Sequence, residues 1–162
     1  MGLTGSRVES IGRKIIGTIL IVVGIVKLVS AARDVPINHL PDPLLPFLTF
    51  REMGIGAGVV ELAIGVLLWI RRFASLHAKA VLWWGCVLSS YRLGLFLVGY
   101  HGACPCLGNA TDWLPGAKGW VQPVLLGIIL LLLLYGGYYT WREFQAQRDQ
   151  MAETGSPDMR PP

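Results

Sequence analysis

Four long apolar stretches divide the chain, and short polar segments separate them. They cover about residues 15–32, 53–70, 78–100 and 121–139, so each holds 18 to 23 residues. A helix rises about 1.5 Å per residue, and about 20 residues cross roughly 30 Å of hydrocarbon. A β-barrel would need alternating apolar and polar residues, whereas Leu125–Leu134 carries no polar side chain. The pattern therefore predicts an all-α bundle of four transmembrane helices.

The composition supports a membrane environment. Hydrophobic residues make up 53% of the 162 residues and charged residues 15%, against about 45–50% and about 25% in soluble domains. A soluble domain of this length leaves much of its surface in water, so we expect membrane lipid to cover the excess apolar surface. The net charge of +4 comes from basic residues spread at the ends of the apolar stretches, and we expect no nucleic-acid partner.

The distribution of lysine and arginine predicts the orientation. Nine of them flank the apolar stretches on the side that holds both termini, and three lie in the two opposite segments. Positive residues concentrate on the cytoplasmic side, so we expect an N-in/C-in bundle. Residues 1–14 then form a cytoplasmic N-terminus, residues 15–140 the membrane domain, and the polar residues 141–162 a cytoplasmic tail that we expect to be disordered.

The first apolar stretch also admits a second interpretation. A basic pair, Arg13 and Lys14, precedes it, and the small residues Ala31 and Ala32 end it, as in a cleavable signal peptide. Lys27 within the stretch argues against this interpretation, because a charge there weakens insertion. We expect the segment to be retained as a helix.

A pair of cysteines carries the candidate chemistry. Cys104-Pro105-Cys106 follows the third stretch on the side expected to face the periplasm, a compartment in which disulfides persist. A disulfide across one residue closes a very small ring, which favours reduction and restrains little of the unfolded chain. The pair therefore suits thiol–disulfide exchange with an exported protein better than it suits a structural role.

Other interpretations of this segment stay open. His101 joins the two cysteines in an H-x-x-C-x-C pattern that could hold copper or zinc, although three ligands leave a four-ligand site incomplete. The cysteines could also be unpaired and incidental. Cys86 lies about 12 Å from the inner end of the third stretch, too far from the pair to join it, and we expect it to be a small core residue.

Charged residues inside the apolar stretches form a second candidate feature. Lys27, Glu61 and Arg92 lie on three different stretches, all expected in the outer half of the membrane. An isolated charge at mid-membrane costs about 2.5–3.5 kcal/mol, so we expect Glu61 to pair with Lys27 or Arg92. Tyr91 could add a hydrogen bond. The cluster is either a structural ion pair or a polar pocket that receives a quinone head group or relays protons.

Two further groups of residues fit the membrane interpretation. The segment 36–50 mixes four prolines with large apolar residues, and we expect it to lie on the membrane surface above the pocket. Most aromatic residues flank the apolar stretches, which is typical of an interfacial belt. They are Trp69, Trp83, Trp84, Trp113, Trp120, Tyr138, Tyr139 and Trp141.

Short motifs give the chain a resemblance to a known family. Gly17, Gly24 and Lys27 in the first stretch, and Glu61 followed by Gly65 in the second, are similar to the DoxX-like four-helix membrane proteins. The third stretch running into Cys104-Pro105-Cys106-Leu107-Gly108 resembles the methylamine utilisation (MauE) branch. Leu107 departs from the aromatic residue that often stands there.

The resemblance covers roughly residues 13–139 and implies a multi-pass protein of the bacterial inner membrane that helps form disulfides in exported proteins. By position, Cys104 and Cys106 correspond to the redox pair, and Lys27 and Glu61 to the intramembrane polar pair. In methylamine metabolism the implied client is the disulfide-rich small subunit of methylamine dehydrogenase.

The function expected from these features is thiol–disulfide exchange through Cys104 and Cys106 with a periplasmic thioredoxin-like or disulfide-containing client. Electrons would leave to a second thiol protein or to a quinone. The alternative is a non-enzymatic membrane subunit or assembly factor with incidental cysteines.

Overall fold

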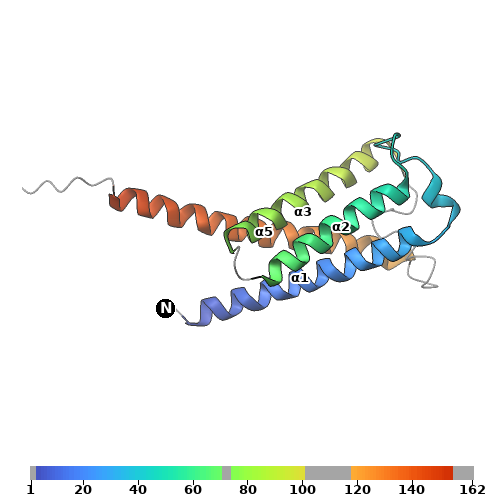
Figure 1. Cartoon of the computed structure of the whole chain (residues 1–162). Helices are drawn as coiled ribbons and strands as arrows, with labels where there is room; N and C mark the ends of the chain where they lie inside the picture. Colours follow the sequence, from blue (N-terminus) through green and yellow to red (C-terminus); the bar gives the residue numbers. More distant parts are fainter. Residues whose placement is uncertain (1–2, 71–73, 101–117, 155–162) are drawn as a thin grey trace, which may run out of the picture.

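The computed structural model describes residues 3–70, 74–100 and 118–154. Its helices are α1 (Leu3–Ala32), the short 3-10 helix η1 (Pro36–His39), α2 (Phe50–Trp69), α3 (Ala74–Leu97) and α5 (Lys118–Thr154). The four long helices lie alongside one another and reverse direction at each connection (Figure 1). Pairing of the β type in the described ranges is confined to one isolated bridge, between Pro41 and Thr49.

Four helices are long and apolar enough to cross a membrane, which confirms that part of the sequence prediction. The candidate spans are Glu9–Ala32, Phe50–Trp69, Leu76–Leu97 and Gln122–Met151. They overlap the four predicted stretches and are longer at several ends. If all four cross, an even number of crossings puts both chain ends on one side of the bilayer.

Both end segments are more helical than expected. α1 already includes most of residues 1–14. The expectation of a disordered tail from residue 141 is wrong as far as Thr154, because α5 continues to that residue; residues 155–162 lie outside the described ranges. The physical reason is local propensity: residues 141–154 contain Glu, Gln, Arg, Ala and Met and no glycine or proline, so nothing interrupts the helix.

The helices pack as two close antiparallel pairs, α1 with α2 and α3 with α5. In the first pair, glycines stand where the backbones approach. A Cβ on Gly24 would lie 2.9 Å from the carbonyl oxygen of Gly58, and one on Gly65 would lie 2.9 Å from the carbonyl oxygen of Gly17. Any larger side chain at these positions would force the helices apart. Small residues commonly permit such close approach between helices in membranes.

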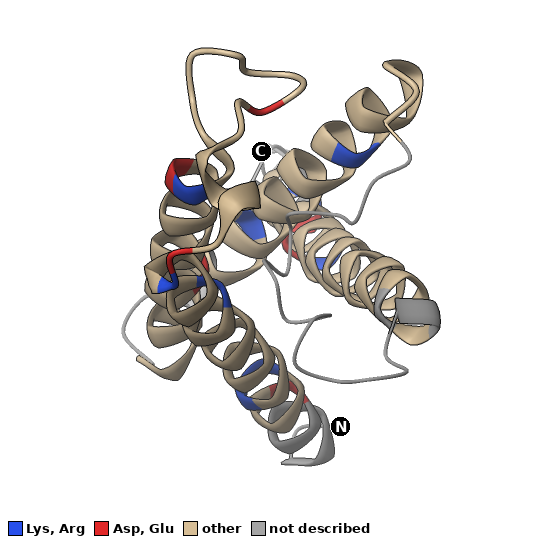
Figure 2. Ribbon diagram, turned by 90° about the vertical axis from the view of Figure 1, so that its right-hand side faces the viewer, with Lys and Arg blue, Asp and Glu red and all other residues tan. Residues whose placement is uncertain are grey.

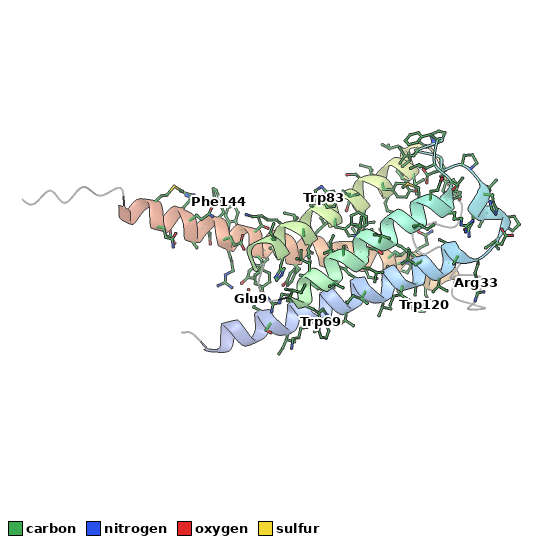
Figure 3. All side chains as sticks on the ribbon, in the orientation of Figure 1. Glu9, Arg33, Trp69, Trp83, Trp120 and Phe144 are labelled. Atoms are coloured by element: carbon green, nitrogen blue, oxygen red, sulfur yellow. The ribbon has the colours of Figure 1, made fainter. Side chains whose placement is uncertain are left out.

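A small core joins the two pairs. It draws on all four long helices, and its Leu20, Leu68 and Leu132 are at most 1% exposed. Elsewhere large apolar side chains face outward, as expected where lipid rather than water covers the helices. Figure 3 shows Trp69 and Trp83 on the outside of the bundle, and their exposed fractions are 55% and 58%.

The segment between α1 and α2 is folded against the end of the bundle, and its expected position on the membrane surface stays a prediction. The side chain of Leu44 packs on α3 at Gly94. A Cβ added to Gly94 would lie only 2.8 Å from Leu44 Cδ1. The rings of Phe50 and Tyr100 contact each other in a tilted arrangement, with their centroids 6.2 Å apart. Figure 2 views the molecule from this end and shows the segment crossing the ends of the helices. The end of α3 is thereby tied to the start of α2.

Candidate functional site: a buried ion pair beside an intramembrane cavity

Lys27 of α1 and Glu61 of α2 form an ion pair inside the bundle. Lys27 Nζ donates a hydrogen bond to Glu61 Oε1 at 2.5 Å, and the two residues are 3% and 1% exposed. Burying either charge alone in a low-dielectric interior carries a penalty of several kcal/mol, which a partner in good geometry offsets. The structure thus pairs Glu61 with Lys27, one of its two expected partners.

Helix geometry explains why these two side chains meet. The glycine contacts place Gly17 level with Gly65 and Gly24 level with Gly58, so the Lys27 and Glu61 backbones are about 9 Å apart along the axes. Side chains on a helix lean toward its N-terminus. Because α1 and α2 are antiparallel, Lys27 and Glu61 lean toward each other and close this gap.

Trp84 of α3 brings a third helix to the ion pair. Its indole Nε1 donates to Glu61 Oε1 at 3.3 Å, and the side chain is 6% exposed. The expectation that Trp84 belongs to an interfacial belt is therefore wrong. A buried indole needs an acceptor for its N–H, and the carboxylate supplies one. Glu61 Oε2, by contrast, is buried and has no hydrogen-bond partner in the described ranges.

A cavity of about 80 Å³ lies beside the ion pair, between α1, α2 and α3. Its walls are almost entirely apolar, and polar groups enter at only a few points. The lining residues are Lys27, Met53, Gly54, Ala57, Trp84, Val87, Leu88 and Tyr91. Two of the four residues predicted for a polar pocket, Lys27 and Tyr91, therefore border one cavity, and Glu61 is hydrogen-bonded to two of its lining residues.

Tyr91 connects this cavity to the segment between α1 and α2. Its hydroxyl donates to Asp42 Oδ2, while Asp42 Oδ1 accepts from the backbone N–H groups of Leu44 and Leu45 at 2.8 and 3.0 Å. Asp42 is 1% exposed. Sequence reasoning missed Asp42, and the available signal was an acidic residue standing between two prolines, Pro41 and Pro43.

Arg92 does not join the ion pair. Its Nη2 donates to Gln122 Oε1 of α5 at 2.5 Å, and Arg92 is absent from the cavity lining. The prediction that it shares a pocket with Glu61 is wrong, because consecutive residues on a helix point in directions about 100° apart. Tyr91 lines the cavity beside α2, whereas Arg92 faces α5 and bonds to Gln122 there.

The cysteines divide between described and undescribed parts of the chain. Cys104, Cys106 and His101 lie outside the described residues, so the proposed redox pair and metal ligands stay predictions. Cys86 lies on the exposed side of α3, which corrects the expectation of a core residue. Among residues 3–70, 74–100 and 118–154, no three histidine, cysteine or acidic residues are grouped to hold a metal ion.

The site as described is therefore an ion pair, a tryptophan and a tyrosine around an apolar cavity inside a helical bundle. Such an arrangement can accept an uncharged molecule that presents a hydrogen-bonding group, or it can simply hold three helices in register. Comparisons of the chain with models of protein families, with curated proteins and with solved structures found no match.

Proposed function

We propose that the chain is an integral membrane thiol–disulfide exchange protein that uses Cys104 and Cys106. The observation that carries the proposal is the Cys-Pro-Cys sequence in the segment that joins two candidate membrane-spanning helices, α3 and α5. Tyr100, the last described residue before that segment, contacts Phe50 in a tilted arrangement at the end of the bundle where residues 33–49 pack.

The proposed orientation puts this end of the bundle outside the cytoplasm. The nine-to-three bias of lysine and arginine supports cytoplasmic termini in a bacterial inner membrane. Both connecting segments, 33–49 and 98–117, then face a compartment in which thiols are oxidised. The resemblance to the MauE branch supports the same orientation and suggests an exported client rich in disulfides.

The proposed reaction exchanges one disulfide for another. A thiolate of the client attacks the Cys104–Cys106 disulfide and forms a mixed disulfide. The second client thiolate then attacks that bond and releases the pair as a dithiol. The client loses two electrons and two protons, and the pair gains them. An acceptor must remove these electrons before the next cycle.

Trapping the mixed disulfide tests this proposal. In a Cys86→Ser background, Cys104→Ser or Cys106→Ser keeps one thiol, whose thiolate should attack a disulfide of the oxidised client and form the same mixed disulfide from the reverse direction. This adduct should accumulate and be released by dithiothreitol, because the second thiol of the pair, which would displace the client, is missing. The double serine variant is the matched control and should trap nothing. A membrane-impermeant maleimide should label the reduced pair in intact spheroplasts.

Two results would contradict the proposal. Labelling of the pair only after lysis would reverse the orientation. Full function of both single serine variants in cells would favour the alternative, a non-enzymatic subunit or assembly factor whose helices carry the activity.

A further inference from the structure

The ion pair beside the cavity has unused hydrogen-bonding capacity. A lysine ammonium carries three N–H donors. One of them binds Glu61 Oε1, and Lys27 has no other hydrogen-bond partner in the described ranges. Glu61 Oε2 is buried without a partner. Unsatisfied polar groups inside a bilayer are costly. Lys27 lines the cavity, so an occupant that offers it a hydrogen-bond acceptor would be stabilised here.

The walls of the cavity indicate where such an occupant comes from. Met53, Ala57, Val87 and Leu88 surround it, all of them within the candidate spans. Val87 is 37% exposed on the outer surface of α3, so the cavity adjoins the part of the bundle that lipid covers. A molecule dissolved in hydrocarbon can reach this position, whereas a hydrated solute would have to be stripped of water first.

The charge balance of the ion pair and the volume of the cavity limit the chemical class of molecule that could bind there. Glu61 already neutralises Lys27, so an ionic ligand would bring an uncompensated charge into the membrane at a high cost. The cavity of about 80 Å³ has about half the volume of an engineered cavity of about 150 Å³ that binds benzene. It therefore accommodates one edge of a ring compound, and the remainder must extend toward lipid.

We propose that this cavity binds the carbonyl edge of an uncharged, lipid-soluble ring compound of the quinone class. The oxygen of the quinone, or of the reduced quinol, accepts a hydrogen bond from Lys27 Nζ, which lines the cavity. Glu61 lies behind Lys27 and balances its charge, so an uncharged ring compound binds without a change in net charge. Trp84 and Tyr91 limit the space around the ring.

Binding at the cavity stands independently of the cysteines. A role as electron acceptor rests on the proposed thiol–disulfide exchange. In that role the quinone takes up the two electrons and two protons that the Cys104–Cys106 dithiol releases on closing, and it leaves as the quinol.

A pair of ring compounds that differ only in their carbonyl groups tests the binding. The probes are 2,3-dimethyl-1,4-naphthoquinone, whose methyl groups block the ring positions that a thiolate would attack, and 2,3-dimethylnaphthalene. They are added to the full chain in nanodiscs, with the thermal unfolding midpoint as the readout. A ligand that binds only the folded state stabilises it in proportion to the logarithm of the ligand concentration once that concentration exceeds the Kd, and the midpoint rises accordingly. We expect the quinone to raise it and the hydrocarbon to have at most one tenth of the affinity.

Variants locate the site. Ala57→Leu fills the cavity without altering a polar group and should weaken quinone binding at least tenfold. Ala63→Leu, on the exposed side of the same helix, is the matched control and should leave it unchanged. The double variant Lys27→Met with Glu61→Met removes both hydrogen-bonding groups together and should also weaken binding tenfold.

The outcomes separate the two proposals. Equal binding of both probes, or unchanged binding in Ala57→Leu, overturns the quinone site. The Cys104→Ser, Cys106→Ser double variant should bind the quinone like the unmodified chain. If it does while no client is trapped by the single variants, the thiol exchange fails and the cavity site stands.

Discussion

Lys27 and Glu61 are 34 residues apart in the chain, and their side chains are joined at 2.5 Å in the interior of the bundle. The contact depends on the close approach of α1 and α2 at Gly24 and Gly58. A longer distance between these helices would leave both charges unpaired in a medium that solvates neither. The glycine contacts and the ion pair therefore stabilise the same arrangement.

The ion pair should show strong coupling between its two partners. Lys27→Met alone leaves a buried carboxylate without its counter-ion and should lower the free energy of unfolding by about 3–5 kcal/mol. Adding Glu61→Met should recover most of that loss, because apolar side chains then fill the space. Denaturation in mixed detergent micelles, arranged as a double-mutant cycle, measures the coupling. Additive losses would show that the charges do not stabilise each other.

The glycine contacts between α1 and α2 should tolerate no side chain. In Gly24→Ala the new Cβ would meet the Gly58 carbonyl oxygen at 2.9 Å, and the resulting shift should cost about 1–3 kcal/mol. Gly127→Ala is the matched control, because a Cβ there meets nothing within 4 Å, and alanine favours the helix by up to about 1 kcal/mol. Equal stability of the two variants would contradict the observed packing.

The hydrogen bond between Tyr91 and Asp42 should hold the segment 33–49 against α3. Tyr91→Phe removes the hydroxyl from a buried carboxylate, and bonds to charged groups contribute about 1.5–3 kcal/mol. We expect faster amide hydrogen exchange at Leu44 and Leu45, whose N–H groups bond to the same Asp42. Ser90→Ala, next to Tyr91 on the exposed side of α3, should leave the exchange unchanged. Identical exchange in both variants would show that the segment is held by other contacts.

Two adjacent tryptophans should respond differently to lipid. Trp83 is 58% exposed and projects from α3, whereas Trp84 is 6% exposed and bonds to Glu61. In vesicles of brominated phospholipid, Trp83→Phe should remove a quenched component of the fluorescence, and Trp84→Phe should remove an unquenched one. The opposite assignment would mean that α3 is rotated about its axis.

Hydropathy alone determined the four helices that are long and apolar enough to span a membrane. Long apolar stretches at 15–32, 53–70, 78–100 and 121–139 match α1, α2, α3 and α5. They could be found from the sequence because the free energy of transferring a segment into hydrocarbon is a sum over the segment's own residues. The sequence also predicted that Glu61 forms an ion pair, because an unpaired carboxylate inside a bilayer is costly. The sequence offered two candidate partners, Lys27 and Arg92.

The tertiary structure decided which residues meet. Rotation of each helix about its axis directs Arg92 to Gln122, Trp84 to Glu61 and Cys86 outward. In a membrane the sequence says little about this rotation, because apolar side chains face both the core and the hydrocarbon. The helical repeat of apolar and polar residues that marks the buried face of a soluble helix is therefore missing. Only the close packing of one helix on another distinguishes the two faces, and that packing lies in no single segment of the chain.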